Sequence, residues 1–258
     1  MDGVSGGLLG PVLLAGGLLL LAGFTIAVRR GFKPALRRLR GYEALPRQIG
    51  QVVETGGRLH VSLGPNSLTD REAGATLPGL AMLELAAQAS TVADRPPLAT
   101  TADGTTVWAM SDTLRRAYTG EDEAGGGPDG QPPAEQGAFL VALDPTALAG
   151  GVTSLIPGDD VRASVLFGSF GSEGALMAGA GARGGIPPAG GSDRLEAQAA
   201  GFAMADDVLI GEEMFAARAY LGERPAALGG LLAQDVLRWV IAGLIGLGVV
   251  LQTLGLLN

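Results

Sequence analysis

Two long apolar runs lie near opposite ends of the chain, and the sequence between them alternates apolar and polar positions. The first run, Leu8–Val28, contains 21 residues without a charged side chain. As a helix it would be roughly 30 Å long, which matches the hydrocarbon core of a bilayer. The second run is Val240–Leu257. We predict one transmembrane helix within residues 1–28 and another within residues 236–258.

Each apolar run has an alternative interpretation. The first run could be a cleaved signal peptide, and the last could be the buried core helix of a globular domain. A signal peptide fits less well because no basic segment precedes the run and no clear A-x-A site follows it. We therefore expect both runs to remain in the protein as membrane anchors.

Basic residues follow the first apolar run directly. Between Arg29 and Arg47 there are seven basic residues and one acid, Glu43. Positive residues next to a span stay in the cytoplasm, so this basic juxtamembrane segment, residues 29–50, predicts that both chain termini are outside. The segment is either a topology signal alone or an amphipathic helix on anionic lipids. The residues expected at the membrane surface are Arg29, Arg30, Lys33, Arg37, Arg38 and Arg40.

Residues 51–235 are predicted to form a cytoplasmic domain in which strands and helices alternate. The stretch Arg58–Gly64 alternates in the manner of a strand, with Leu59, Val61 and Leu63 on one face. Further strand patterns occur in the stretches 95–101, 138–143 and 161–168 and after residue 207. This alternation predicts an α/β fold with a largely parallel sheet and flanking helices.

Capping signals predict where several helices begin. Thr69 and Glu72 form a capping box before one helix, and a second helix is expected over Ser111–Tyr118. A capped turn or short helix is expected over Asp144–Ile156. The stretch 119–137 is rich in glycine, proline and acidic residues, and predicts a mobile surface loop.

A partial sequence echo suggests that the domain consists of two related βαβα halves. The sequence from Ser111 to Leu114, with Gly120, has the same internal spacing as Ser192 to Leu195 with Gly201. Common N-cap residues can produce such an echo by chance, so both interpretations stay open.

Composition and charge exclude several classes of function. The stretch Gln48–Asp235 carries 24 acidic residues against 10 arginines, which would repel nucleic acid. Cysteine is absent and His60 is the only histidine, so thiolate chemistry and histidine-rich metal sites are excluded. We find no phosphate-binding or zinc-protease motif, and we expect no metal and no cofactor.

The pattern strand, glycine, helix with an acidic first turn occurs three times. Glycine permits the sharp turn, and a carboxylate favours the positive end of the helix dipole. Each acid therefore caps its own helix, or else several converge at the carboxyl edge of the sheet and hold a divalent cation or a cationic ligand. The candidate ligand-binding residues are Glu72, Glu173, Glu212, Asp112 and Asp193.

A hydrolase is a third interpretation of the chain. Ser169 or Ser172 could act with His60, but the stretch around them departs from the G-x-S-x-G pattern. His60 also precedes both serines, in contrast to the order found in α/β-hydrolases. We expect His60 to be buried in the core with its hydrogen bonds satisfied.

Small residues four positions apart occur in both apolar runs, at Gly23 and Ala27 and at Ala242 and Gly246. This spacing lets helices approach closely, and it also arises by chance in glycine-rich spans. It is a hint that the spans pair with each other or across subunits.

Several segments together resemble a bacterial membrane family known as domain of unknown function 6754. They are "ETGGRLHVSLG", "DRPPLATT", "FGSFGSE", "LIGEEMFAARAYLG" and "AQDVLRWV". The resemblance covers most of the chain from Glu54 to the second apolar run. It implies a two-pass protein of the bacterial inner membrane, and no activity or catalytic residue.

From these patterns we expect a scaffold or assembly component that works through interaction, without evident catalysis. Its expected partners are the lipid bilayer and further copies of itself or other membrane proteins, with no nucleic acid and no specified small-molecule ligand. The alternatives are the ligand- or cation-binding sensor and, with least support, the membrane-anchored hydrolase.

Overall fold

The computed structural model describes residues 5–70, 73–91, 95–119, 137–186, 188–204, 208–222 and 224–254. The chain forms two compact units. One, the helical unit, combines Met1–Leu36 with Gly222–Asn258, and the other, the α/β unit, is Arg37–Leu221.

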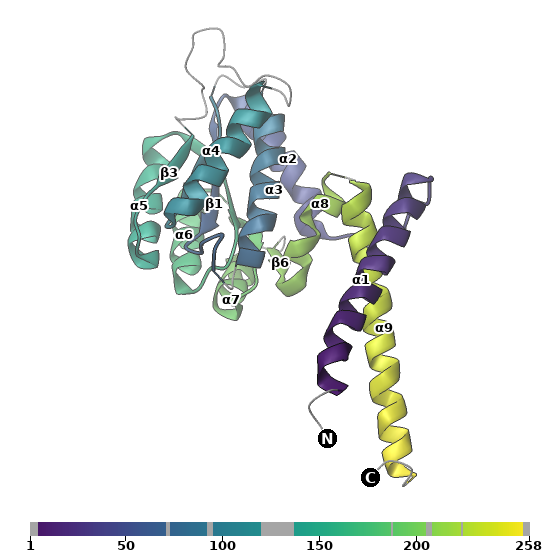
Figure 1. Cartoon of the computed structure of the whole chain (residues 1–258). Helices are drawn as coiled ribbons and strands as arrows, with labels where there is room; N and C mark the ends of the chain where they lie inside the picture. The colour runs from purple at the N-terminus through teal and green to yellow at the C-terminus, as the bar shows by residue number, and fades with distance from the viewer. Residues whose placement is uncertain are drawn as a thin grey trace. The chain divides into compact units, whose positions relative to one another are not determined.

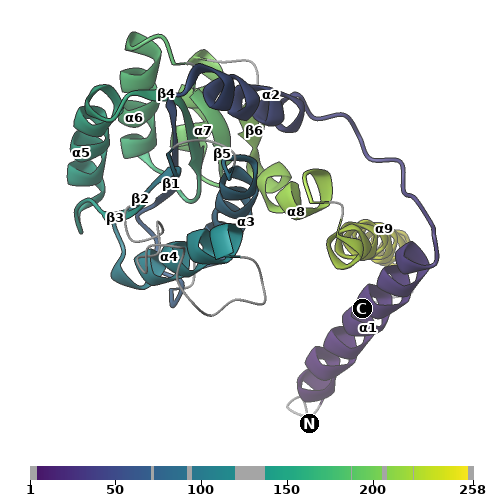
Figure 2. The same cartoon turned by 90° about the horizontal axis from the view of Figure 1, so that it is seen from above.

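The α/β unit is built on a six-stranded sheet in which every neighbouring pair is parallel. The strand order is β3-β2-β1-β4-β5-β6 (Figures 1 and 2, with all six strands labelled in Figure 2). The strands are β1 (Arg58–Gly64), β2 (Leu98–Thr101), β3 (Ala138–Leu140), β4 (Val161–Phe167), β5 (Pro188–Ser192) and β6 (Val208–Ile210). The predicted α/β fold with a parallel sheet is therefore confirmed.

Helices cover both faces of this sheet (Figures 1 and 2). They are α2 (Arg40–Thr55), α3 (Ala73–Ala89), α4 (Gly104–Thr119), α5 (Pro145–Gly158), α6 (Ser172–Arg183) and α7 (Leu195–Met204), followed by the 3-10 helix η2 (Gly211–Ala216) and α8 (Ala217–Tyr220). On one side α3 packs on α4, and on the other α6 packs between α5 and α7. This two-sided cover explains why β1 is almost entirely buried, including its polar residues His60 and Ser62, although its sequence alternates apolar and polar positions.

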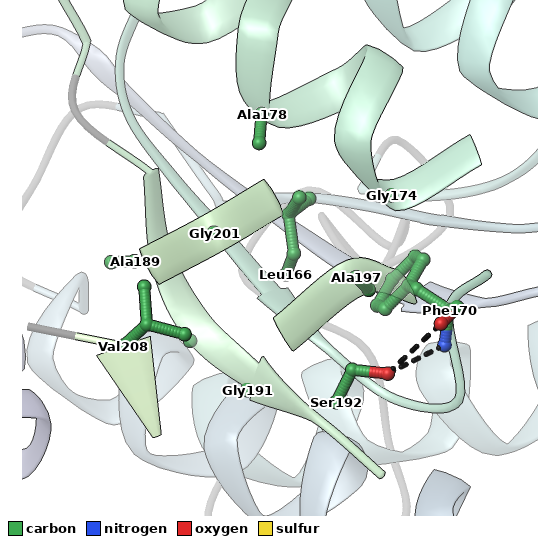
Figure 3. Close-up of a pocket in the computed structure, with 11 residues that line it drawn as sticks. Leu166, Phe170, Gly174, Ala178, Ala189, Gly191, Ser192, Ala197, Gly201 and Val208 are labelled. Atoms are coloured by element: carbon green, nitrogen blue, oxygen red, sulfur yellow. Dashed lines mark hydrogen bonds between the residues drawn. The ribbon is translucent and has the colours of Figure 1, made fainter. Parts of the chain in front are cut away.

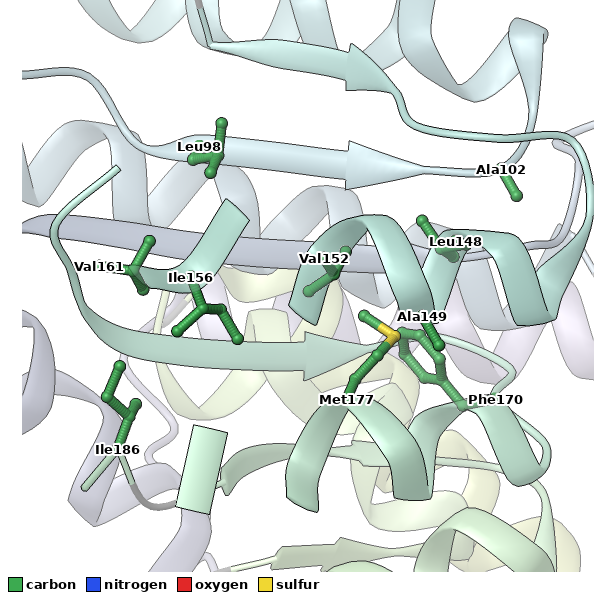
Figure 4. Close-up of a cluster of buried hydrophobic side chains, with 10 residues drawn as sticks. All are labelled: Leu98, Ala102, Leu148, Ala149, Val152, Ile156, Val161, Phe170, Met177 and Ile186. Atoms are coloured by element: carbon green, nitrogen blue, oxygen red, sulfur yellow. The ribbon is translucent and has the colours of Figure 1, made fainter. Parts of the chain in front are cut away.

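The core on one side of the sheet is a cluster of apolar side chains that range from alanine to phenylalanine (Figure 4). Val152 and Ile156 of α5 and Met177 of α6 pack there against Leu98 and Val161, which come from β2 and β4. Val152 and Ile156 are four residues apart and so lie on one face of α5, which is the face that is buried.

The strand order starts at the centre and runs outward twice, over β1 to β3 and over β4 to β6. Two consecutive βαβαβ units would give this order. The sequence echo does not mark equivalent places in them, however. Ser111 lies inside α4, whereas Ser192 is the last residue of β5.

Some element boundaries differ from the prediction. The helix expected from Ser111 begins at Gly104, because Asp103 accepts a hydrogen bond from the backbone N–H of Thr106 and caps it. Strand β5 was not predicted, since its sequence "PAGGS" has no apolar alternation. Glu72 and residues 120–136 of the predicted acidic loop lie outside the described residues.

The predicted domain boundaries also shift. Helix α2 was assigned largely to the basic juxtamembrane segment, but it belongs to the α/β unit and packs on β1 and β4 to β6. Its C-terminus is closed by Gly56, which adopts the left-handed conformation that glycine tolerates best. The last helix, α9 (Pro225–Thr253), begins at Pro225 rather than at residue 236.

The helical unit consists of α1 (Ser5–Arg29) packed on α9. Gly229 of α9 lies so close to Thr25 of α1 that an added Cβ would be 2.7 Å from the Thr25 backbone nitrogen. Within the described residues, α9 is the one helix long and apolar enough to cross a membrane, with a mean hydropathy of 1.8. The apolar stretch of α1 that meets the same hydropathy test, Leu13–Arg29, is shorter.

Candidate functional site

The carboxyl ends of β1 and β4 form the first place to look for a site. In open parallel sheets ligands bind where the strand order reverses, and here that point lies between these two strands. Gly64 ends β1 with a φ of +83°, and a Cβ added there would lie 3.4 Å from the ring of Phe170 and 3.5 Å from the carbonyl oxygen of Ser169. The loops after β1 and β4 therefore meet at the position expected for a ligand.

The loop after β1 is held by a network of hydroxyl groups. The Ser67 Oγ lies 2.8 Å from the Thr69 Oγ1 and 2.9 Å from the Thr105 Oγ1. Thr105 in turn donates to the carboxylate of Asp103, the N-cap of α4. Burial raises the pKa of Asp103, but hydrogen bonds from Thr105 and Thr106 outweigh it and lower the pKa overall. These polar groups bind each other and position the loop.

The loop after β4 is fastened to the end of β5 by Ser192. The Ser192 Oγ accepts the backbone N–H of Phe170 at 3.0 Å and donates to the Phe170 carbonyl at 3.1 Å (Figure 3). It also accepts the backbone N–H of Arg194. One hydroxyl thus holds the turn that leads into α6.

Glu173 caps its own helix. Its Oε1 accepts the backbone N–H of Gly171 at 2.7 Å, and the side chain is buried. A carboxylate here also favours the positive end of α6. The guanidinium of Arg194 lies next to the same glycine. This geometry agrees with the capping interpretation.

The other predicted acidic residues lie apart from Glu173. Glu212 lies in η2 after β6, two strands away from β4, which separates the strand ends by about 10 Å. Asp193 is exposed in the turn after β5, and Glu72 lies outside the described residues. Within the described ranges no three His, Cys, Asp or Glu side chains are grouped to hold a metal ion.

Asp112 is located well inside α4. It lies eight residues beyond the start of that helix, roughly 12 Å from the carboxyl edge of the sheet. Its carboxylate pairs with Arg115 and Arg116, and the hydrogen bond from Arg115 lowers its pKa. Asp112 therefore forms local ion pairs on the surface of α4.

An apolar cavity lies behind these loops, between β4 to β6 and the helices α6 and α7 (Figure 3). Leu166, Phe170, Ala178, Ala197 and Val208 line it together with several glycines. Its volume is about 30 Å³. That is enough for a water molecule and far below the volume of ordinary ligand pockets, so this cavity is a packing defect.

His60 is fully buried in the middle of the sheet, and its two ring nitrogens are both engaged. Nδ1 lies 2.8 Å from the Ser164 Oγ of β4, and Nε2 lies 2.9 Å from the Thr100 Oγ1 of β2. Burial lowers the pKa of His60 to about 3, so the ring is neutral at pH 7. The prediction of a buried, satisfied histidine is confirmed.

This arrangement leaves no histidine base for a serine nucleophile, because His60 is the only histidine of the chain. The Ser169 side chain is 1% exposed and its Oγ has no hydrogen-bond partner. Ser172 begins α6. Because His60 binds Ser164 and Thr100 instead, the geometry does not support the hydrolase interpretation.

The two ends of the α/β unit are held together by a group we call the tyrosine clasp: Arg37, Tyr42, Glu213, Met214 and Tyr220. The two tyrosine rings stack with centroids 4.8 Å apart. Tyr42 donates to the carbonyls of Glu213 and Met214, Tyr220 donates to the carbonyl of Arg37, and Arg37 pairs with the Glu213 carboxylate. Burial, followed by the charges of Tyr220 and Glu213, raises the pKa of Tyr42.

The predicted membrane-surface residues are divided between the two units. Those in the helical unit are Arg29, Arg30 and Lys33. In the α/β unit, Arg37 belongs to the clasp, Arg38 pairs with Glu43, and Arg40 is the exposed first residue of α2.

Sequence reasoning missed Ser192, Asp103 and the clasp. Asp103 was detectable, because an aspartate directly before a helical stretch is a standard N-cap signal. Ser192 follows two glycines in a stretch without apolar alternation, which hid the strand it ends. The clasp joins residues more than 170 positions apart, and no local pattern indicates such a contact.

Comparison with known proteins identifies a family but no activity. No curated protein and no solved structure matches the chain. The sequence profile described as Domain of unknown function (DUF6754) matches residues 11–258, nearly the whole chain. The protein described here therefore belongs to the DUF6754 family.

Proposed function

We propose that this chain is a two-pass protein of the bacterial cytoplasmic membrane whose α/β unit acts as a scaffold or assembly component on the cytoplasmic side. The main support for the proposal is that α9 is apolar but exposed: none of its most apolar 18-residue window is buried within the protein. A helix that is apolar all round needs an apolar environment, and a bilayer supplies it. Asp235 and Arg238, the charged residues of α9, form an ion pair and offset each other.

The packing of α1 on α9 supports a second span. Thr25, near the end of α1, contacts Gly229, near the start of α9. The two helices are therefore antiparallel, and a chain that crosses a membrane along both would have its termini on the same side. The arginines after α1 favour the cytoplasm, and under this proposal both termini lie outside.

An interaction role is favoured by how the described polar groups are used. Glu173, Ser192 and His60 each bind neighbouring parts of the fold and have a structural explanation. The tyrosine clasp joins the segment before α2 to the segment that leads towards α9. An α/β unit held in this way by its two ends is suited to present a rigid surface at the membrane.

The absence of cysteine makes the topology directly testable. We would introduce Ser154→Cys, on the exposed side of α5, and separately append a cysteine after Asn258. A membrane-impermeant maleimide should label the C-terminal cysteine in intact spheroplasts, and residue 154 only after lysis. Labelling of residue 154 in intact spheroplasts would place the α/β unit outside and contradict the proposal.

The helix pair has its own test. Leu21→Cys and Gly230→Cys should be joined by a short bifunctional thiol crosslinker, because an added Cβ at Gly230 lies 3.8 Å from the Leu21 Cδ1. Gly229→Leu should abolish the crosslink by forcing the helices apart. Gly243→Leu is the matched control, since no atom lies within 4 Å of its Cβ position. Equal crosslinking in both variants would show that α1 and α9 do not pair this way.

The assembly role is tested by mass in nanodiscs. A scaffold should be isolated as a defined species larger than one 26.0 kDa chain. A strictly monomeric protein at micromolar concentration, with no co-purifying subunit, would contradict it.

A further inference from the structure

We propose that a cavity at the amino edge of the sheet binds a small hydroxylated monocarboxylate, such as a sugar acid. This amino-edge cavity has a volume of about 610 Å³. Gln48, Gln51 and Thr55 of α2 line one wall, and Arg162 of β4 and Ile186 line the other. The inference goes beyond the proposed scaffold role, because it concerns a ligand of the α/β unit and needs no membrane.

The architecture explains why polar groups meet here. Gln48, Gln51 and Thr55 follow one another at intervals of three and four residues, so they lie on one side of α2. That helix crosses the sheet and contacts both β1 and β4. The volume is within the range of small-molecule sites, unlike the 30 Å³ apolar cavity at the opposite edge.

Gln48 supplies an acceptor that is not used within the fold. Its Oε1 is buried and has no hydrogen-bond partner. A buried carbonyl without a donor is unfavourable, so rotation of the Gln48 amide towards a ligand that offers an O–H group would gain a hydrogen bond that the free protein lacks. This favours a hydroxylated ligand over a purely apolar one.

Arg162 supplies the charge. An added Cβ on Gly57 would overlap the Cγ of Arg162, so the backbone at Gly57 packs tightly on the arginine stem and helps to position it. Its Nη2 pairs with the Asp160 Oδ1 at 2.7 Å, and this is its only ion pair with a described residue. The remaining guanidinium N–H groups form a planar fork that matches a carboxylate.

The surrounding charges select a monoanion. An adjoining cavity of about 300 Å³ shares Arg162 and contains Arg183 and Asp160. The three side chains together carry one net positive charge. The carboxyl-terminal ends of α2, α5 and α6 face the same edge and carry partial negative charge, which disfavours anions in proportion to their charge and therefore disfavours a dianion more than a monocarboxylate.

Three six-carbon probes separate the contributions of charge and hydroxyl groups. D-gluconate carries both, hexanoate carries only the carboxylate, and glucitol carries only the hydroxyls. We would measure binding by calorimetry to the full chain in nanodiscs, with inorganic phosphate as a fourth probe. Gluconate should bind, and the other three should bind at least about tenfold more weakly.

Two substitutions test the assignment of residues. Arg162→Gln should weaken gluconate binding by about tenfold or more through loss of the charged fork. Gln48→Met removes the unpartnered carbonyl, so it should weaken binding about tenfold while the ligand-free protein becomes no less stable. Arg116→Gln, an exposed arginine of α4, is the matched control and should leave binding unchanged.

Several results would overturn the proposal. The first is that gluconate does not bind at 10 mM, a dissociation constant that corresponds to a binding free energy of about 3 kcal/mol. The second is that both variants still bind gluconate as the unchanged protein does. The third is that hexanoate binds as tightly as gluconate, and the fourth is that phosphate binds instead and depends on Arg162. Should Arg162→Gln fail to fold, Gln48→Met still decides, because removing an unpartnered carbonyl does not disrupt a bond. None of these outcomes bears on membrane topology or assembly, so the two proposals fail separately.

Discussion

The two edges of the sheet in the α/β unit use their polar side chains differently. At the carboxyl edge Asp103, Glu173 and Ser192 each hold a loop or a helix start. At the amino edge Gln48 and Arg162 line a cavity and leave hydrogen-bonding groups unused. Open parallel sheets usually bind ligands at the carboxyl edge. Here most of the described polar groups at that edge hold the fold, apart from the buried Ser169 Oγ, which has no hydrogen-bond partner. The amino edge differs in having a cavity of about 610 Å³ beside its unpartnered group.

The largest expected change in the free energy of unfolding comes from a substitution that tests how tightly the carboxyl edge is packed. A methyl group in Gly168→Ala would overlap the carbonyl oxygen of Leu63 on the neighbouring strand, and should lower the free energy of unfolding by about 3 kcal/mol. Urea unfolding followed by far-ultraviolet circular dichroism measures it. Gly50→Ala is the control on α2, where no atom lies within 4 Å, and should stabilise by about 0.5–1 kcal/mol.

The second largest change concerns the pH dependence of stability, which we expect His60, located between the two edges of the sheet, to produce. Its pKa is about 3 in the folded state and 6.5 for the unperturbed group, so the unfolded chain takes up the proton first as the pH falls. Stability from the neutral ring is thus fully present above pH 6.5 and is lost towards pH 3. Between pH 6 and 4 the free energy of unfolding should fall by about 2.5 kcal/mol more than in His60→Gln. Parallel pH curves for the two proteins would show that His60 titrates normally.

The third effect separates capping from ligand binding at the carboxyl edge. Glu173→Ala removes the acceptor for the Gly171 N–H and should cost about 1 kcal/mol. Glu173→Gln keeps an acceptor and should cost less. Loss of divalent-cation affinity at unchanged stability would instead favour the sensor interpretation.

The smallest effect on stability is expected at the amino edge. The ion pair between Arg162 and Asp160 is half exposed, so Arg162→Gln should change the free energy of unfolding by less than about 0.5 kcal/mol. A destabilisation as large as that of Gly168→Ala would mean that Arg162 serves the fold rather than a ligand.

Sequence reasoning predicted the sheet better than the site. Strand β1 was predicted with its observed bounds, because its apolar residues alternate and end at a glycine. Strand β5 was missed, since its glycines and alanine are selected by close contacts: an added Cβ at Gly190 would overlap the carbonyl of Leu166. Such contacts join distant parts of the chain and have no local pattern.

The predicted acidic residues illustrate the same limit. Glu173 was correctly located in the first turn of a helix, since that depends on local sequence. Whether Glu173, Glu212 and Asp112 converge depends on strand order and on where α4 begins. Gln48 and Arg162 were not candidates at all, because their proximity results from α2 crossing the sheet.

The tyrosine clasp has a practical consequence. With Tyr220 bonded to Arg37, the stretch Arg37–Leu221 begins and ends at neighbouring points. Domains whose ends are close tolerate excision and circular permutation. A short linker from Leu221 back to Arg37, with new termini opened elsewhere, should yield a water-soluble, permuted form suitable for crystallisation without detergent.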